Sequence, residues 1–449
     1  MEPLLIKNAA IVNEGKITTG HVYCENGFIE KIIHTEVPAS ILNRRPRVIE
    51  ADNKFLIPGI IDDQVHFREP GLTHKADIRS ESRAAIAGGI TSYLEMPNTS
   101  PPTTTRQLLE EKLSIARTAS MANYSFFMGA TNDNLNELLD TDPLLTCGIK
   151  IFMGSSTGNM LVDDEAVLRS IFSKIKIPVA VHCEDESVIQ ANILAHRRKF
   201  GENIPVIMHP AIRSEEACFK SSSHAVELAR EYGTRLHVLH ISTEKELALF
   251  NSDTPVENKR ITAEVCIHHL WFDQNDYARY GSMIKWNPAV KTKRDKDALI
   301  RAVSDGRIDV IATDHAPHTI DEKSNTYFKS PSGGPMVQHA LAAMMEMVKK
   351  GLISIEKAVE KMCHAPSVIF NIEKRGYIRE GYYADLVLLD TAKSWKVTKE
   401  NILYKCGWSP MEGQIFSTTI THTVLNGHVV YENGVIDEQP RSMQLSFNR

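Results

Sequence analysis

The sequence predicts an α/β fold: a (β/α)8 barrel of the TIM type with a small β-sandwich domain built from both chain ends. Two observations carry this prediction. Eight short apolar runs alternate with amphipathic stretches in the middle of the chain, and β-type runs separated by turn residues occupy both ends. Strands that alternate with helices favour a parallel sheet, and eight repeats favour a closed barrel over an open doubly wound sheet.

The two ends of the chain share one pattern. Residues 1–57 contain short β-type runs, such as 4–6 and 28–33, between turn signals. The pattern returns near the C-terminus, where Asn426-Gly427 separates two apolar runs and indicates a two-residue hairpin. We therefore expect a composite β domain from 1–57 and 376–449, with a barrel domain of residues 58–375 inserted into it.

The middle of the chain predicts the barrel elements in order. The expected strands are 59–66, 90–96, 124–128, 149–153, 178–182, 236–241, 261–265 and 308–314. Amphipathic helices are expected at 77–87, 106–119, 164–174, 215–230, 294–304 and 337–347. Isolated glycine pairs do not form a phosphate-binding fingerprint, which argues against a nucleotide-binding fold.

Composition narrows the class of protein. The chain has 449 residues, a formal net charge of −5 and no basic block, so nucleic acid is not an expected partner. No apolar run approaches the roughly 18 residues of a membrane helix, and seven scattered cysteines without CxxC spacing indicate free thiols in a reducing compartment. We expect a cytoplasmic protein with a small-molecule substrate and no membrane partner; a homo-oligomer is compatible with the sequence.

Several expected strands end in residues that can bind a metal. In a TIM-type barrel the site forms at the C-terminal ends of the strands. The residues expected there are His66, Asn98, Lys150, His182, His240 and Asp314. Imidazoles with a carboxylate are a ligand set for zinc or a similar divalent ion.

Other histidines lie near these strand ends. His237 is three residues before His240, so we expect the two to face opposite sides, with His237 facing the helical layer or making a structural hydrogen bond. His268 and His269 follow the seventh strand, and we interpret them as residues outside the chemistry.

Lys150 lies inside the apolar strand Gly148-Ile149-Lys150-Ile151-Phe152-Met153. A charged amine is costly to bury there, so burial is expected to lower its pKa. The neutral amine could then react with carbon dioxide and become a carbamate, a carboxylate-like ligand able to bridge two metal ions. A side chain that extends out of the barrel is the alternative, which the apolar neighbours disfavour.

Several short motifs occur in the order of a known family. They are Pro58-Gly59-Ile60-Ile61-Asp62, His66-Phe67-Arg68-Glu69-Pro70-Gly71, Met96-Pro97-Asn98-Thr99, Ile149-Lys150, Val181-His182, His240-Ile241-Ser242-Thr243, Trp286-Asn287-Pro288-Ala289, Thr313-Asp314-His315-Ala316-Pro317-His318 and Ser409-Pro410-Met411-Glu412-Gly413. In these motifs the chain resembles the amidohydrolase superfamily and, within its cyclic amidohydrolase group, most closely the dihydroorotases.

The resemblance implies a cyclic amide hydrolase that reversibly closes N-carbamoyl-L-aspartate to (S)-dihydroorotate in pyrimidine synthesis. It implies one or two Zn2+ ions and N6-carboxylation of Lys150. The implied metal ligands are His66, Lys150, His182, His240 and Asp314, with Asp314 also the general base. The implied substrate-binding residues are Arg68, Asn98, Asn287 and His318. An arginine fork suits a substrate carboxylate, which uncharged cyclic amides lack.

The first motif departs from the family pattern. The family has His-x-His, whereas this chain has Gln64-Val65-His66, and strand parity places Gln64 in the position of the missing ligand. An amide oxygen is a poorer zinc ligand than imidazole, so we expect a weakened first metal position beside a better occupied second one. Two alternatives stay open: a dihydroorotase-like scaffold with impaired catalysis, and a cyclic amidohydrolase for another substrate, of the dihydropyrimidinase or allantoinase type.

Overall fold

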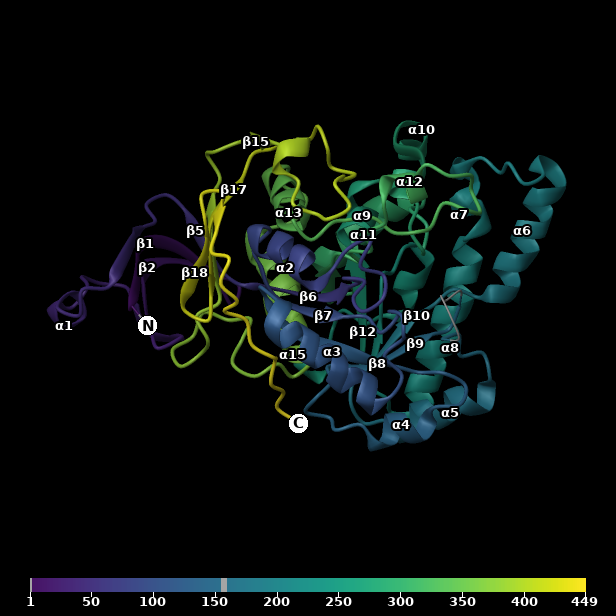
Figure 1. Cartoon of the computed structure of the whole chain (residues 1–449), viewed down its shortest axis with the longest axis horizontal. Coiled ribbons are helices and arrows are strands. Elements are labelled where there is room, and N and C mark those ends of the chain that lie inside the picture. Colours follow the sequence, from purple (N-terminus) through teal and green to yellow (C-terminus); the bar gives the residue numbers. More distant parts are fainter. Residues whose placement is uncertain (1, 155–159) are drawn as a thin grey trace.

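A barrel of parallel strands lies beside a mixed β-sheet in the computed structural model, which describes residues 2–154 and 160–449 (Figure 1). The barrel strands pair in sequence order, and a parallel bridge between Val65 and His315 joins the first strand to the residues after the last. Their bounds are β6 Ile60–Val65, β7 Ile90–Glu95, β8 Asn123–Gly129, β9 Gly148–Phe152, β10 Val179–His182, β11 Leu236–Val238, β12 Ile261–Cys266 and β13 Val310–Ala312. The predicted TIM-type barrel is confirmed.

Two strands are shorter than the sequence predicted. The ranges 236–241 and 308–314 extend too far, because the backbone leaves the extended region at His240, with φ of 40°, and at Asp314, with φ of 44°. Both residues instead begin the loops at the C-terminal end of the barrel.

Five long helices lie where the amphipathic pattern placed them: α2 Ile78–Ala87, α3 Arg106–Ala119, α5 Glu165–Lys174, α8 Glu215–Tyr232 and α11 Lys293–Asp305. Each begins after an Asp, Thr or Ser whose side chain accepts a hydrogen bond from a backbone N–H of the first turn, which satisfies an otherwise unpaired donor. The other helices are α1 Ala39–Leu42, α4 Leu135–Asp140, α6 Glu186–Phe200, α7 His209–Ile212, α9 Ile267–Trp271, α10 Tyr277–Tyr280, α12 Ile320–Lys323, α13 Ala340–Lys349, α14 Ile355–Val359 and α15 Ala365–Ile369.

Helix α13 starts later than the predicted residue 337. The backbone N–H groups of Met336 and Val337 donate to Nδ1 of the buried His315, at 2.9 and 3.3 Å. These donors are held by a side chain rather than by a helix turn. His315 is thereby a structural residue that joins the last strand to α13.

Strands from both chain ends form a single nine-stranded sheet, shown in purple and yellow at one end of Figure 1. Its strands are β1 Leu4–Asn13, β2 Lys16–Glu25, β3 Phe28–Ile33, β4 Arg47–Glu50, β5 Phe55–Pro58, β14 Leu386–Asp390, β17 Thr419–Leu425, β18 His428–Glu432 and β19 Val435–Ile436. The expected hairpin at Asn426-Gly427 joins β17 to β18. The sheet is mixed, because β1 pairs in parallel with β4 and β5.

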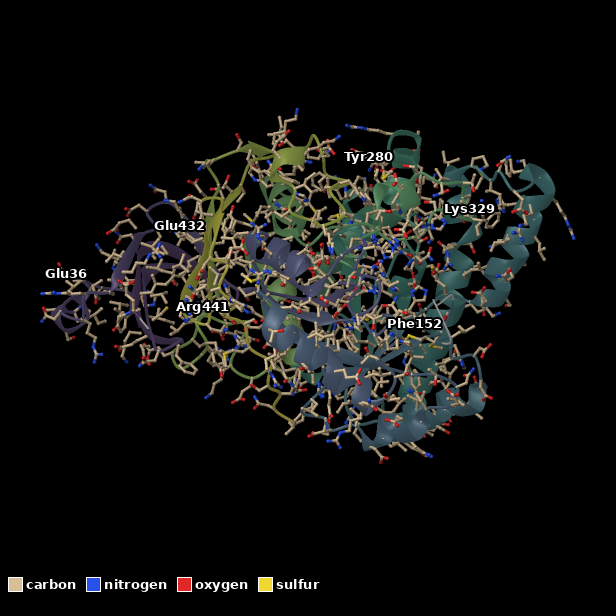
Figure 2. The ribbon with its side chains drawn as sticks, viewed as in Figure 1. Glu36, Phe152, Tyr280, Lys329, Glu432 and Arg441 are labelled. Carbon is tan, nitrogen blue, oxygen red and sulfur yellow. The ribbon has the colours of Figure 1, made fainter. Side chains whose placement is uncertain are left out.

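The terminal sheet joins the barrel directly. Strand β5 leads through Gly59 into β6, and a Cβ atom at Gly59 would lie 2.1 Å from Oγ1 of Thr91. Side chains show the same two-part arrangement: Glu36 and Glu432 belong to the sheet end, and Phe152 lies in the barrel half (Figure 2). Two further short strands, β15 Trp395–Lys396 and β16 Ile415–Phe416, pair separately.

The C-terminal segment packs at the end of the barrel opposite the strand C-termini. Leu445 and Phe447 belong to the apolar cluster that contains Phe127 and Ala180 of the barrel strands. The N–H of Leu445 donates to the carbonyl of Tyr124, near the start of β8.

All seven cysteines are free thiols, as the sequence indicated. Among the helices of the described ranges, none combines the length and apolar character needed to cross a bilayer.

Candidate active site

The C-terminal ends of the barrel strands open into a cavity of ≈ 500 Å³. Every residue that the sequence assigned to the site lines this cavity. They are Gln64, His66, Arg68, Asn98, Lys150, His182, His240, Asn287, Asp314 and His318. Parallel strands bring residues far apart in sequence to one edge, which is why the motifs converge here.

His182 and His240 form one half of the site. Nδ1 of His182 lies 3.0 Å from Nε2 of His240, and both side chains are buried. Burial holds the pKa of His240 well below its usual range and lowers that of His182. Two neutral imidazoles that point ring nitrogens at one place suit a shared metal ion.

His66, Asp314 and Gln64 form the other half. Nε2 of His66 lies 3.1 Å from Oδ1 of Asp314, and Nε2 of Gln64 donates to the same oxygen at 3.4 Å. Nδ1 of His66 lies 2.7 Å from Oδ1 of Asn98, which orients the imidazole so that Nε2 faces the carboxylate. Gln64 therefore occupies the position that strand parity gave it, with its amide nitrogen on Asp314.

Lys150 lies between the two halves on β9 and is 1% exposed. Its Nζ has no hydrogen-bond partner within the described part of the chain, and it lies 4.6 Å from the ring centre of Phe152. Burial lowers its pKa to about 7, so a large fraction of the amine is neutral at physiological pH. An unpartnered buried amine is costly, which makes this residue a candidate for a ligand or a modification.

A basic pair lines the mouth of the cavity. Nη2 of Arg68 lies 3.0 Å from Nε2 of His318, and Nε of Arg68 donates to the carbonyl of Pro317 at 3.1 Å. Burial lowers the pKa of Arg68 to about 10, which leaves the guanidinium charged at neutral pH. Burial, and then the charge of Arg68, hold the pKa of His318 well below its usual range, so its imidazole is neutral.

Three site residues adopt a left-handed backbone: Arg68 with φ of 69°, His240 with φ of 40° and Asp314 with φ of 44°. Non-glycine residues rarely adopt this conformation, and it persists only where the surroundings enforce it. The N–H of His240 donates to Oε1 of the buried Glu264 at 2.9 Å, which is one such constraint.

The cavity also contains residues that the sequence analysis missed. Arg213, Lys285 and His209 line it. Glu184 supports it, because its Oε2 lies 3.1 Å from Nε2 of His182 and it pairs with Arg213. Burial would raise the pKa of Glu184, but the charge of Arg213 and the hydrogen bond with His182 outweigh it and hold the pKa at about 2. The position of Glu184 two residues after His182 could have indicated its role from the sequence. No sequence pattern indicated the other three residues, Arg213, Lys285 and His209.

His237 makes structural interactions, one of the two expectations for it. Its Nε2 lies 3.1 Å from Oδ2 of Asp63 and 3.7 Å from Oε2 of Glu264, and its Nδ1 lies 2.8 Å from Oγ1 of Thr262. The ring of His237 packs edge-on against Phe370, which belongs to the same apolar cluster as Phe127 and Ala180 of the barrel strands. The hydrogen bonds, and not a contact with the helical layer, therefore account for its position.

Comparison with known proteins identifies the family. The sequence pattern of the family described as "Amidohydrolase family" matches residues 55–430, most of the chain. The chain belongs to the amidohydrolase family. The dihydroorotase of Methanosphaera stadtmanae is 31% identical over 96% of this chain and 97% of its own length. The dihydroorotase of Staphylococcus epidermidis strain RP62A is also 31% identical, over 95% of this chain and 99% of its own length. The resemblance to dihydroorotases drawn from the motifs is thus confirmed.

Solved amidohydrolase structures share the fold. The L-hydantoinase (dihydropyrimidinase) of Arthrobacter aurescens superposes with a TM-score of 0.93 at 27% identity, over 99% of this chain and 100% of that one. The dihydropyrimidinase of Brevibacillus agri superposes with a TM-score of 0.88 at 21% identity, over the full length of both chains, and supports the fold alone. Buried histidines and acidic groups at the barrel are consistent with a metal centre of the kind typical of this family.

Proposed function

We propose that this amidohydrolase is a dihydroorotase, which reversibly cyclises N-carbamoyl-L-aspartate to (S)-dihydroorotate in pyrimidine synthesis. The observation that carries the proposal is the buried pair of Arg68 and His318 at the cavity mouth. A guanidinium offers two parallel donors to a carboxylate, and His318 lies directly beside it. Full-length similarity to proteins named dihydroorotase supports the same substrate.

The charge of the cavity favours an acidic substrate. Arg68, Arg213 and Lys285 line it, whereas Asp314 is the one carboxylate among the described lining residues. Lys285 already donates to the carbonyls of Tyr327 and Ser330, at 2.7 and 2.5 Å, and Arg213 pairs with Glu184. Arg68 contacts the carbonyl of Pro317 and the ring of His318 and forms no salt bridge in the described part of the chain, which suits it to bind the substrate carboxylate.

The donor set fits the zinc that the family implies. His182 and His240 point nitrogens at one place, and the unpartnered Nζ of Lys150 lies in the same cavity. We assign His66, Lys150, His182, His240 and Asp314 to hold one or two zinc ions. When bound, zinc would polarise the reacting carbonyl and lower the pKa of water. Lys150 would first be carboxylated: its neutral nitrogen bonds to the carbon of CO2, and the nitrogen loses one proton to solvent water.

The side chains that line the cavity would bind the substrate and transfer the proton. Arg68, Asn98 and His318 would hold the substrate carboxylate, and Asn287 would contact the substrate from the loop after the seventh strand. Asp314 would act as general base during ring opening: it takes a proton from the attacking water and returns it to the leaving nitrogen. In ring closure the same carboxyl group moves the proton in the opposite direction.

Gln64 is expected to weaken metal binding on the His66 side of the site. Its amide nitrogen donates to Oδ1 of Asp314, at 3.4 Å, so its position adds a hydrogen bond where the family pattern has an imidazole ligand. We therefore propose that the His66 side binds metal more weakly than the His182 and His240 side. Asp314 would still serve as base with one ion bound.

A hydantoinase activity is the second candidate, favoured by the TM-score of 0.93 with an L-hydantoinase. Hydantoins and dihydropyrimidines lack the carboxylate that Arg68 would bind. The test is a parallel assay of the zinc-loaded protein on dihydroorotate, dihydrouracil, a hydantoin and allantoin. Turnover of dihydroorotate above the others supports the proposal, and turnover of an uncharged ring alone rejects it. No turnover on any of them favours the scaffold alternative.

A further inference from the structure

Three potential metal ligands lie together just beyond β12, outside the set assigned above. Cys266, His268 and His269 are buried, and each offers a ligand atom within 4.8 Å of the other two. Zinc bonds of about 2.0–2.3 Å at tetrahedral angles place ligand atoms about 3.5 Å apart, so a small side-chain adjustment closes this triad around one ion. None of the three lines the cavity.

Three of the four ring nitrogens of these two imidazoles lack the hydrogen bonds that buried rings normally make. In the described ranges, neither ring nitrogen of His268 nor Nδ1 of His269 has a partner of normal geometry. Nε2 of His269 lies 3.1 Å from the carbonyl of Pro288, so it carries the proton and leaves the lone pair on Nδ1. A histidine fixed in this way by a backbone carbonyl is the usual arrangement of a metal ligand.

Packing holds the rings in place. The His268 ring stacks on Trp286 with centres 4.3 Å apart and planes 9° apart, and the His268 and His269 ring centres are 4.2 Å apart. Stacking satisfies the faces of the His268 ring but not the nitrogens on its edge. Packing therefore fixes the orientation of both rings, and the polar neighbours of their nitrogens are backbone groups of Pro288 and Thr313.

The described residues hold one other such triad, and it does not need a metal. In the group of Asp63, His237 and Glu264 the imidazole lies 3.1 Å from one carboxylate and 3.7 Å from the other. A protonated His237 already supplies the positive charge between those carboxylates. The group of Cys266, His268 and His269 contains no such internal pair.

We propose that Cys266, His268 and His269 bind one zinc ion through a thiolate and two neutral imidazoles. Thiolate and imidazole are preferred zinc ligands, and three of them leave a fourth position. Oε1 of Gln64, 3.5 Å from Sγ of Cys266, is placed to fill it. Gln64 also lines the cavity, so the proposed ion would lie next to the cavity wall.

Charge and proton balance agree with the proposal. Binding requires Cys266 to release its thiol proton to solvent water, so that Glu264, whose Oε1 lies 3.4 Å from the sulfur, keeps its charge. One zinc ion, one thiolate and two neutral rings carry a net charge of +1. With Asp63 and Glu264 ionised and His237 protonated, the neighbouring group carries a net charge of −1, which compensates this positive charge.

Sulfur provides a test that does not depend on enzyme activity, because the ligands assigned in the cavity are all nitrogen and oxygen. X-ray absorption of the intact, zinc-loaded protein should show one zinc–sulfur distance of about 2.3 Å per chain. Cobalt in place of zinc should give a thiolate-to-cobalt charge-transfer band in the near ultraviolet. A spectrum fitted by nitrogen and oxygen alone, with no such band at saturating cobalt, overturns the proposal.

A matched pair of variants identifies the cysteine that provides the sulfur ligand. Cys266→Ser should lose the band and one equivalent of bound metal, whereas Cys24→Ser, a buried thiol of the terminal sheet, should keep both. Loss of the band in Cys24→Ser, or its survival in Cys266→Ser, overturns the assignment. Should Cys266→Ser fail to fold by circular dichroism, the zinc–sulfur distance in the unmodified protein decides the question alone.

Discussion

Nη2 of Arg68 lies 3.0 Å from Nε2 of His318, although 250 positions separate the two residues in the sequence. The pair is buried at the mouth of the cavity, and the guanidinium is charged while the imidazole is neutral. If this pair binds the substrate carboxylate, its contribution should appear in catalysis rather than in folding.

Replacement of Arg68 should therefore impair turnover of dihydroorotate. Arg68→Ala should reduce kcat/KM by the equivalent of roughly 2–5 kcal/mol, because a substrate carboxylate would be left without its charged partner. Arg68→Lys, which keeps the charge but loses the planar fork, should fall by less. Steady-state kinetics measure both, and an unchanged rate in Arg68→Ala would count against the assigned role.

Lys150 should be required for metal retention. Lys150→Ala should lose most bound zinc and activity, because it removes the proposed carbamate from between the two halves of the site. Added short-chain carboxylates should restore part of the activity, since they can occupy the space of the missing carbamate. Metal analysis with and without propionate checks this, and full zinc retention in the unsupplemented variant would contradict it.

Gln64→His should raise the metal content. The imidazole would replace an amide that now donates to Asp314, and so complete the ligand pair that begins with His66. We expect the bound metal to increase by up to one ion per chain, measured by mass spectrometry after dialysis. Gln64→Asn, a shorter amide, is the control and should bring no increase. An equal content in wild type and Gln64→His would show that the first position is already filled.

His237 should make stability depend on pH above neutrality. Burial opposes its protonation, but Asp63 and Glu264 outweigh this and raise its pKa to about 9 from an ordinary 6.5. A raised histidine pKa stabilises the fold fully below about pH 6.5, and this stabilisation is lost as the pH rises through about 9. Its full size is of the order of 3 kcal/mol.

The comparison of wild type with His237→Gln measures this contribution. The wild-type Tm should fall between pH 7 and 9.5, and the variant, which has no proton to lose there, should fall by less. Parallel pH profiles of Tm for the two proteins would exclude an imidazolium at this position. Burial also raises the pKa of the adjacent Glu264, to about 7, so the difference between the two proteins reports on the His237–Glu264 pair together.

Much of the site could be predicted from the sequence because parallel strands carry their last residues to one edge. Motifs at His66, Lys150, His182 and His240 each follow an apolar run, so alternation and spacing were enough to place them in one cavity. The departure at Gln64 was also visible, because side chains two apart on a strand share a face.

The remaining features depend on contacts that no local pattern contains. Glu184 acts through Arg213 and His182, a network that spans two loops. The early ends of β11 and β13 follow from left-handed backbone at His240 and Asp314, which apolar periodicity does not report. Helix α13 begins late because His315 holds two backbone donors, and that side chain lies more than 20 residues earlier.

The packing of Leu445 and Phe447 beneath the barrel has a practical consequence for handling this protein. These side chains cover the N-terminal end of the barrel strands, the end remote from Arg68. Arg449 holds the segment in place by donating to the carbonyls of Pro143 and Thr146. An affinity tag or fusion partner attached after Arg449 would disturb the packing of Leu445 and Phe447 and the hydrogen bonds of Arg449. Attachment ahead of β1 leaves these contacts unchanged and is the better choice.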